Sequence, residues 1–95
     1  MTEKLLRDIA EHYGAQHQTF KLAEEAAELS AAATRFALAK TRADSSAELD
    51  HLIEEAADVL VMISQFAFNY GCEDKLKTIG DEKIRRTIRR MGESV

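Results

Sequence analysis

Apolar side chains recur along the chain at the three- and four-residue spacing of amphipathic helices. Near the start, Leu5, Ile9 and Tyr13 fall on one helical face; Thr2 is the expected N-cap, and Gly14 is expected to end or bend the helix. A second, longer helix is expected from about residue 16 to residue 40. Its apolar stripe consists of Leu22, Ala26, Leu29, Ala33 and Phe36.

A third helix is expected after the short polar segment 41–46. Ser45 followed by Glu48 fits a capping box at its start, and Gly71 is the expected C-cap. From residue 56 to residue 68 this helix is apolar almost all round, and a helix without a polar face is normally covered on several sides. Because a chain of 95 residues offers little cover, a second subunit is expected to pack against it.

The last helix is expected over about residues 73–91, with Gly80 either kinking it or dividing it into two pieces. Residues 92–95 are expected to form a frayed tail. The chain has no proline and only four glycines, which favours helix throughout. We therefore expect one all-α domain over residues 1–95, a bundle of four to five helices completed by oligomerisation.

Composition and charge narrow the class of protein. A chain that is 45% hydrophobic and 32% charged is typical of soluble globular proteins. The net charge of -4 does not favour a nucleic-acid or membrane surface, and the longest apolar run, 59–63, is too short to cross a bilayer. The first residues lack the apolar stretch of a signal peptide, and the single Cys72 allows no internal disulfide. A cytoplasmic protein is expected.

Two short acidic segments have the same form and lie in two of the expected helices. They read Glu24-Glu25-Ala26-Ala27-Glu28 and Glu54-Glu55-Ala56-Ala57-Asp58. Residues three apart on a helix are surface neighbours, so Glu25 pairs with Glu28 and Glu55 pairs with Asp58. Each pair flanks an apolar stripe, so the two pairs are expected to converge if the helices pack through those stripes.

Four carboxylates in one place repel one another, and burying them without compensation would cost several kcal/mol. A cation makes such a cluster tolerable. Magnesium prefers oxygen ligands and combines a few carboxylates with water and substrate phosphates. Zinc is not favoured, because no cysteine or histidine lies at matching spacing. A solvated acidic face is the plainer reading of either segment alone, whereas two copies on adjacent helices favour a metal site.

The double motif, Glu25-x-x-Glu28 and Glu55-x-x-Asp58 with a spacer of 26 residues, is similar to that of the MazG-like nucleotide pyrophosphohydrolases. These enzymes belong to the all-α NTP pyrophosphatase superfamily. The resemblance covers roughly residues 12–91. Its weaker matches are Tyr13-Gly14, Gln18, Lys21, Ala57-Asp58-Val59, Gln65-Phe66 and Lys83-Ile84-x-Arg86.

The resemblance implies a single MazG-like domain that acts as a homodimer or homotetramer. It implies Mg²⁺, with Mn²⁺ as a substitute, bound by Glu25, Glu28, Glu55 and Asp58. It also implies hydrolysis of a nucleoside triphosphate, a dNTP or a non-canonical NTP, to the monophosphate and pyrophosphate.

Further residues are candidates for parts of this reaction. Glu24 and Glu54 could hold a second metal or orient the attacking water as catalytic residues, or could be solvated flank residues. The basic residues that could contact substrate phosphates, or equally form ordinary surface pairs, are Lys21, Lys83, Arg86 and Arg90. Gln18 could read a base edge. These residues do not indicate which nucleobase the substrate carries.

Two alternatives remain open. One is a catalytically silent helical module, which keeps the acidic pattern and binds a partner or regulates through its apolar third helix. The other is a di-iron four-helix bundle, which needs two Glu-x-x-His motifs. Only Glu48-x-x-His51 is present, near a helix start, so the second alternative is disfavoured.

Overall fold

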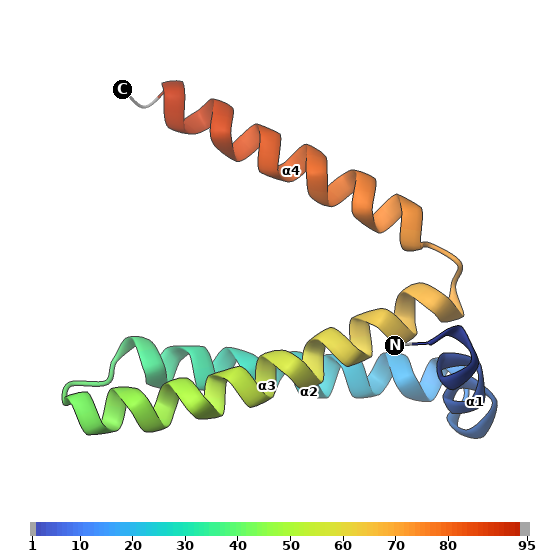
Figure 1. Ribbon diagram of the computed structural model, residues 1–95, viewed down its shortest axis with the longest axis horizontal. Coiled ribbons are helices and arrows are strands. Elements are labelled where there is room, and N and C mark those ends of the chain that lie inside the picture. The colour runs from blue at the N-terminus through green and yellow to red at the C-terminus, as the bar shows by residue number, and fades with distance from the viewer. Residues whose placement is uncertain (1, 94–95) are drawn as a thin grey trace.

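The computed structural model describes residues 2–93, and these form four helices without a strand (Figure 1). The helices are α1 (Glu3–Tyr13), α2 (Ala15–Ala37), α3 (Arg42–Asn69) and α4 (Glu73–Glu93). The all-α class predicted from the sequence is confirmed. Within residues 2–93, no helix combines the length and apolar character needed to cross a membrane.

Gly14 forms the junction between α1 and α2. Its φ of 85° lies in the left-handed region that favours glycine, and its N–H donates to the Ala10 carbonyl 2.8 Å away. At the other end of α1, the Thr2 hydroxyl accepts from the Leu5 N–H at 3.4 Å. The caps predicted at both ends of α1 are therefore confirmed, and α2 begins directly after the glycine.

The start of α3 differs from the prediction. The Thr41 hydroxyl accepts from the Asp44 N–H at 3.0 Å, so Thr41 is the N-cap and α3 begins at Arg42. The capping box predicted at Ser45 and Glu48 is wrong, because both residues already lie inside the helix. Thr41 provides the side-chain acceptor one turn earlier, and Asp44 in the first turn is favourable beside the positive end of the helix dipole.

A short elbow joins α3 to α4. Gly71, with φ 60°, donates to the Phe68 carbonyl at 3.2 Å, and Cys72 donates to the Ala67 carbonyl at 3.0 Å. These two bonds form a Schellman motif in which Tyr70 is the C-cap and Gly71 is the left-handed residue that follows it, so the C-cap predicted at Gly71 lies one residue earlier. Beyond the elbow α4 is one continuous helix through Gly80. Gly92 and Glu93 of the predicted tail are helical, and Ser94 and Val95 lie outside the described residues.

The helices do not close into a compact bundle. Figure 1 shows α2 and α3 side by side as a hairpin, α1 at one end of it, and α4 leaving the elbow at an angle to α3. The buried apolar residues of the described chain are only Leu6, Ala32, Val59 and Ala67, and α4 buries none. The radius of gyration is 16.7 Å, whereas a compact domain of this length would have about 12 Å.

Candidate functional site

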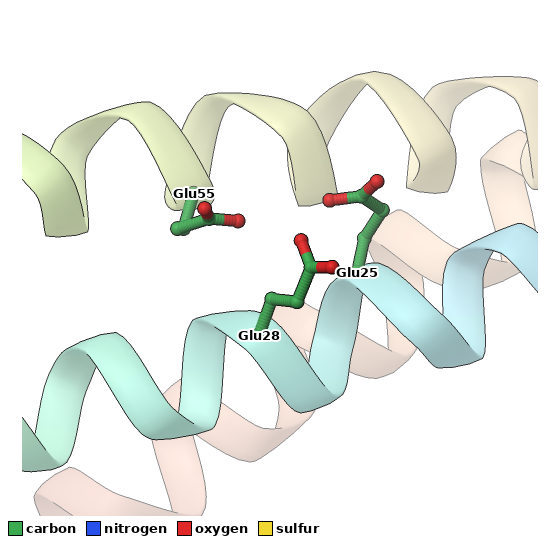
Figure 2. Close-up of side chains that lie close together, drawn as sticks. All are labelled: Glu25, Glu28 and Glu55. Atoms are coloured by element: carbon green, nitrogen blue, oxygen red, sulfur yellow. The ribbon is translucent and has the colours of Figure 1, made fainter.

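Three carboxylates meet in the space between α2 and α3. One carboxylate oxygen from each of Glu25, Glu28 and Glu55 lies within 4.8 Å of the other two. Figure 2 shows Glu25 and Glu28 reaching from α2 toward α3, with Glu55 facing them. The i, i+3 spacing on α2 and the packing of the hairpin thus bring together three of the four predicted metal ligands.

Burial makes this cluster unusual among acidic surfaces. The side chains of Glu25 and Glu55 are only 12% and 14% exposed, respectively. The Oε2 atom of each is shielded from solvent and has no hydrogen-bond partner among the described residues. A buried carboxylate oxygen without a partner is costly. Both atoms are therefore available to ligate a cation.

The electrostatics of the cluster act most strongly on Glu25. Burial raises the pKa of Glu25 above its ordinary value, and the charges of Glu28 and Asp58 raise this pKa further, while Lys21 lowers it. Asp58 is exposed and does not join the three close carboxylates, although its charge acts on Glu25. Its role as a fourth ligand stays a prediction.

Lys21 lies beside the cluster on the same helix. Its Nζ is 3.4 Å from Glu24 Oε2 and 3.5 Å from Glu25 Oε1. The negative charge of Glu24, followed by that of Glu25, raises the pKa of Lys21 and keeps it an ammonium ion. Glu24 is exposed next to Lys21, and Glu54 is exposed on α3 outside the three close carboxylates. The catalytic roles proposed for both glutamates stay predictions.

His51 was not predicted as a site residue, yet it contacts the cluster. Its Nε2 is 3.3 Å from Glu55 Oε1, and its Nδ1 is 3.3 Å from Arg35 Nη2. An arginine can only donate, so Nδ1 is the acceptor, and the neutral ring carries its proton on Nε2, the nitrogen that lies beside Glu55. Arg35 also lies 3.5 Å from Glu48 Oε2. The one sequence signal for this contact was the i, i+4 spacing of His51 and Glu55.

A pocket of about 530 Å³ lies at the α1 end of the hairpin, beside the cluster. Its apolar lining includes Ile9 and Met62. The rings of Tyr13 and His17, which also line it, are stacked with centroids 5.4 Å apart and planes 14° apart. Their i, i+4 spacing across the Gly14 junction was present in the sequence, but it did not by itself indicate a pocket.

Buried amides form another wall of this pocket. Gln18 is 4% exposed, and its Nε2 donates to Gln65 Oε1 at 2.6 Å. The Gln18 Oε1 in turn accepts from Asn69 Nδ2. Lys21 and Glu24 complete the lining, so they connect the pocket to the acidic cluster. The structure thus brings two predicted substrate-binding residues, Gln18 and Lys21, to one pocket.

The other predicted phosphate contacts lie on α4. Lys83 and Arg86 line a groove along that helix together with Arg89. Arg90 lies on the same helix, one turn after Arg86. Of the described helices, α4 contacts only α3, close to the elbow. A single chain therefore does not bring Lys83, Arg86 or Arg90 to the acidic cluster, and their contact with phosphates stays a prediction.

Comparisons with known proteins do not assign this chain to a family. No protein-family model, curated protein or solved structure matches it. The resemblance to the MazG-like enzymes therefore rests on the residues themselves, chiefly on the spacing of the two acidic motifs.

Proposed function

We propose that this chain binds Mg²⁺ through Glu25, Glu28 and Glu55, with Asp58 at the edge, and hydrolyses a nucleoside triphosphate to the monophosphate and pyrophosphate. The observation that carries the proposal is the pair of buried, partnerless carboxylate oxygens on facing helices, Glu25 Oε2 and Glu55 Oε2. A pocket of about 530 Å³ beside them adds support, since its volume lies in the range of small-molecule sites.

The donor set fits magnesium better than a softer metal. The three close groups are all carboxylates, the hard oxygen ligands that Mg²⁺ prefers. The imidazole beside Glu55 is that of His51, which accepts from Arg35 at Nδ1 and therefore carries its proton on Nε2, so Nε2 is not a free ligand atom in this arrangement. Mn²⁺ shares the preference for oxygen and is the expected substitute.

The pocket and the cluster suit different parts of a nucleotide. Stacked rings and apolar side chains favour a base and sugar, and buried amides offer hydrogen bonds for a base edge. Phosphates would lie toward the cluster, where Lys21 already carries a positive charge. The bound metal would supply the positive charge that phosphate oxygens need before they can approach three carboxylates.

Hydrolysis adds water across the bond between the α and β phosphoryl groups and releases pyrophosphate. A carboxylate near the phosphates could orient that water and accept its proton. Glu24 is the better placed of the two candidates, because it lines the pocket and contacts Lys21. Glu54 lines none of the described pockets, so we assign the water-orienting role to Glu24.

A catalytically silent interaction module is the second candidate. The observation that favours it is the exposure of large apolar side chains on α3 and α4, such as Leu60 at 65% and Ile88 at 61%. Such faces mark binding surfaces when they are contiguous. Turnover of a nucleotide separates the two candidates, because only the enzyme releases pyrophosphate.

The proposal is tested with a panel of canonical and modified NTPs and dNTPs, each incubated with the protein in Mg²⁺ or in EDTA. We expect at least one nucleotide to yield its monophosphate and pyrophosphate in Mg²⁺ only, measured by anion-exchange chromatography. Absence of turnover across the panel, with no Mg²⁺ binding by calorimetry, would contradict the proposal. Mg²⁺ binding without turnover would favour the silent module.

His51 is expected to hold Glu55 in position for the metal. Replacing it by leucine removes the polar group that lies 3.3 Å from Glu55 Oε1, and we expect Mg²⁺ affinity to fall about 10-fold, the usual effect of losing such a support. The His51→Gln variant can still present an N–H and should keep most of the affinity. Calorimetric titration with Mg²⁺ measures both.

The exposed His12 on α1 provides the control, since His12→Leu makes the same change away from the cluster. Equal affinity losses in His51→Leu and His51→Gln, or no loss in either, would show that the contact between His51 and Glu55 does not support the metal site.

A further inference from the structure

Three amide side chains form a relay of hydrogen bonds that passes from α3 to α2 and back to α3. Asn69 Nδ2 donates to Gln18 Oε1, and Gln18 Nε2 donates to Gln65 Oε1 at 2.6 Å. Gln18 and Gln65 are 4% and 6% exposed, and both line the pocket of about 530 Å³. Asn69 lies one helical turn beyond Gln65 and does not line the pocket. The relay therefore runs from an inner residue to the pocket wall.

The outer end of the relay is an N–H donor without an acceptor in the described chain. Gln65 Oε1 already accepts from Gln18, and none of the hydrogen bonds between described residues involves Gln65 Nε2. This nitrogen is also not one of the solvent-shielded atoms without a partner, so it keeps contact with solvent. Of the three cavities described above, Gln65 lines only this pocket. An almost buried amide thus offers N–H groups to the pocket.

The inner end of the relay explains its direction. Asn69 Oδ1 is shielded from solvent and has no hydrogen-bond partner among the described residues. Reversing all three amides would keep both bonds, but it would place the NH₂ group of Asn69, with its two donors, in that enclosed position. Buried N–H groups without an acceptor are rarer in proteins than carbonyl oxygens without a donor. The enclosure of Asn69 therefore favours the direction that leaves nitrogen at the pocket.

The lining of the pocket places the amides away from the phosphate end. Along α2 it changes from the ring of His17, through Gln18, to the charged Lys21 and Glu24 beside the acidic cluster. On α3, Gln65 follows the metal-site residue Glu55 by ten positions, or about 15 Å along the helix axis. A nucleotide with its phosphates at the cluster thus has its base beside the amides.

We propose that this pocket selects nucleotides whose base carries a carbonyl oxygen at the position where the matching base carries an amino group. The class consists of 4-keto pyrimidines and 6-keto purines, and the Gln65 N–H groups donate to that carbonyl oxygen. For its occupant, a nucleotide, this base selection rests on the proposed function. A base with an amino group at the same position would set N–H against N–H.

Rejection of the amino base accounts for most of the expected preference. Because Gln65 is almost buried, an N–H group that loses water and finds no acceptor costs free energy. Sites built to hydrogen-bond one group of a substrate discriminate strongly against analogues that lack it. We therefore expect the keto base to be favoured at least about 10-fold.

Matched nucleotide pairs test this preference. In Mg²⁺, kcat/KM is measured for dITP against dATP and for dUTP against dCTP; in EDTA, calorimetry measures the affinities of the four corresponding monophosphates. We expect the keto member to be favoured in every pair that binds. Turnover with equal constants, or with the amino member favoured, would overturn base selection alone. A keto preference in binding without turnover would contradict hydrolysis and support base selection, and an absence of both binding and turnover would overturn both proposals.

The Asn69→Asp variant tests the relay without changing a residue that lines the pocket. An ionised aspartate can only accept, so Gln18 should turn its Nε2 toward position 69 and its Oε1 toward Gln65. Gln65 then donates to Gln18 and offers its own Oε1 to the pocket. The preference should invert, with the amino member favoured in each pair. Because each ratio compares two nucleotides on the same variant, partial unfolding does not change it.

The Gln65→Glu variant places an acceptor at the pocket directly and should give the same inversion, which provides a second test if the first variant folds poorly. The matched control is Gln16→Glu, which adds a carboxylate at an exposed position of α2 and should keep the native preference. An unchanged preference for keto bases in both Asn69→Asp and Gln65→Glu would overturn the role of the relay in base selection.

Discussion

The Glu55→Gln variant is expected to lose at least about 100-fold of the Mg²⁺-dependent pyrophosphate release while keeping its helical content. Glutamine has nearly the same shape as glutamate and can still lie beside His51, but it removes the charge of a buried ligand atom. A metal ion contributes several kcal/mol to catalysis of phosphoryl chemistry, and each 1.4 kcal/mol corresponds to a tenfold change in rate. The loss should appear in initial rates at saturating nucleotide.

Asp50→Asn is the matched control for this substitution. Asp50 is an exposed carboxylate on the same helix and lies outside the close group, so its replacement should leave the rate within about twofold of the native value. Circular dichroism verifies that both variants keep their helices. A Glu55→Gln variant that turns over nucleotide at the native rate would refute the metal role assigned to the three carboxylates.

The second large effect concerns stability without metal. In EDTA at pH 7, the Glu25→Gln variant is expected to be more stable than the native chain, because it removes a buried charge that Glu28 and Asp58 repel. In Mg²⁺ the order should reverse, since the native cluster gains binding free energy that the variant has largely lost. Thermal unfolding followed by circular dichroism measures both differences.

The pH dependence of this difference follows from the direction of the pKa shift. Glu25 has a raised pKa in the folded chain, so the folded state holds its proton more tightly than the unfolded state does. The contribution of Glu25 to stability is therefore present below the ordinary glutamate pKa of about 4.3 and is lost as pH rises through the folded value. The gap between variant and native chain in EDTA should close toward pH 4.

The native chain serves as its own control across the Mg²⁺ and EDTA arms, and Asp50→Asn again reports the effect of removing an exposed carboxylate. A Glu25→Gln variant that is less stable than the native chain in EDTA at pH 7 would contradict the assignment. A stability difference between the Glu25→Gln variant and the native chain in EDTA that stays constant between pH 4 and pH 7 would also contradict it.

The sequence alone predicted the helices well, because each rests on local information. Spacing of apolar residues every three or four positions identifies helices, and Gly14 and Gly71 mark their ends through positive φ values that other residues avoid. The start of α3 was misplaced because two polar residues, Thr41 and Ser45, could both act as caps. Local sequence did not decide between them.

The site could be predicted only in part. The two i, i+3 pairs were visible, but the predicted stripe on α2 was partly wrong, because Ala26 and Ala33 are exposed whereas Ala32 is buried. Which carboxylates meet depends on the relative rotation of α2 and α3, and that rotation joins Glu55 to Glu25 and Glu28 while leaving Asp58 exposed. The His51 contact and the amides around Gln18 depend equally on side chains from different helices.

By itself, then, the sequence determined an all-helical chain with an i, i+3 acidic pair on each of two helices. Both properties follow from spacing along one helix, which backbone geometry fixes locally. Only the tertiary structure decided that three of the four paired carboxylates converge, that two of their oxygens are buried without partners, and that α4 diverges from the hairpin. The meeting of the carboxylates depends on how α2 and α3 are rotated against each other, and the direction of α4 depends on the Gly71 elbow. In both cases a small local difference changes which distant side chains meet.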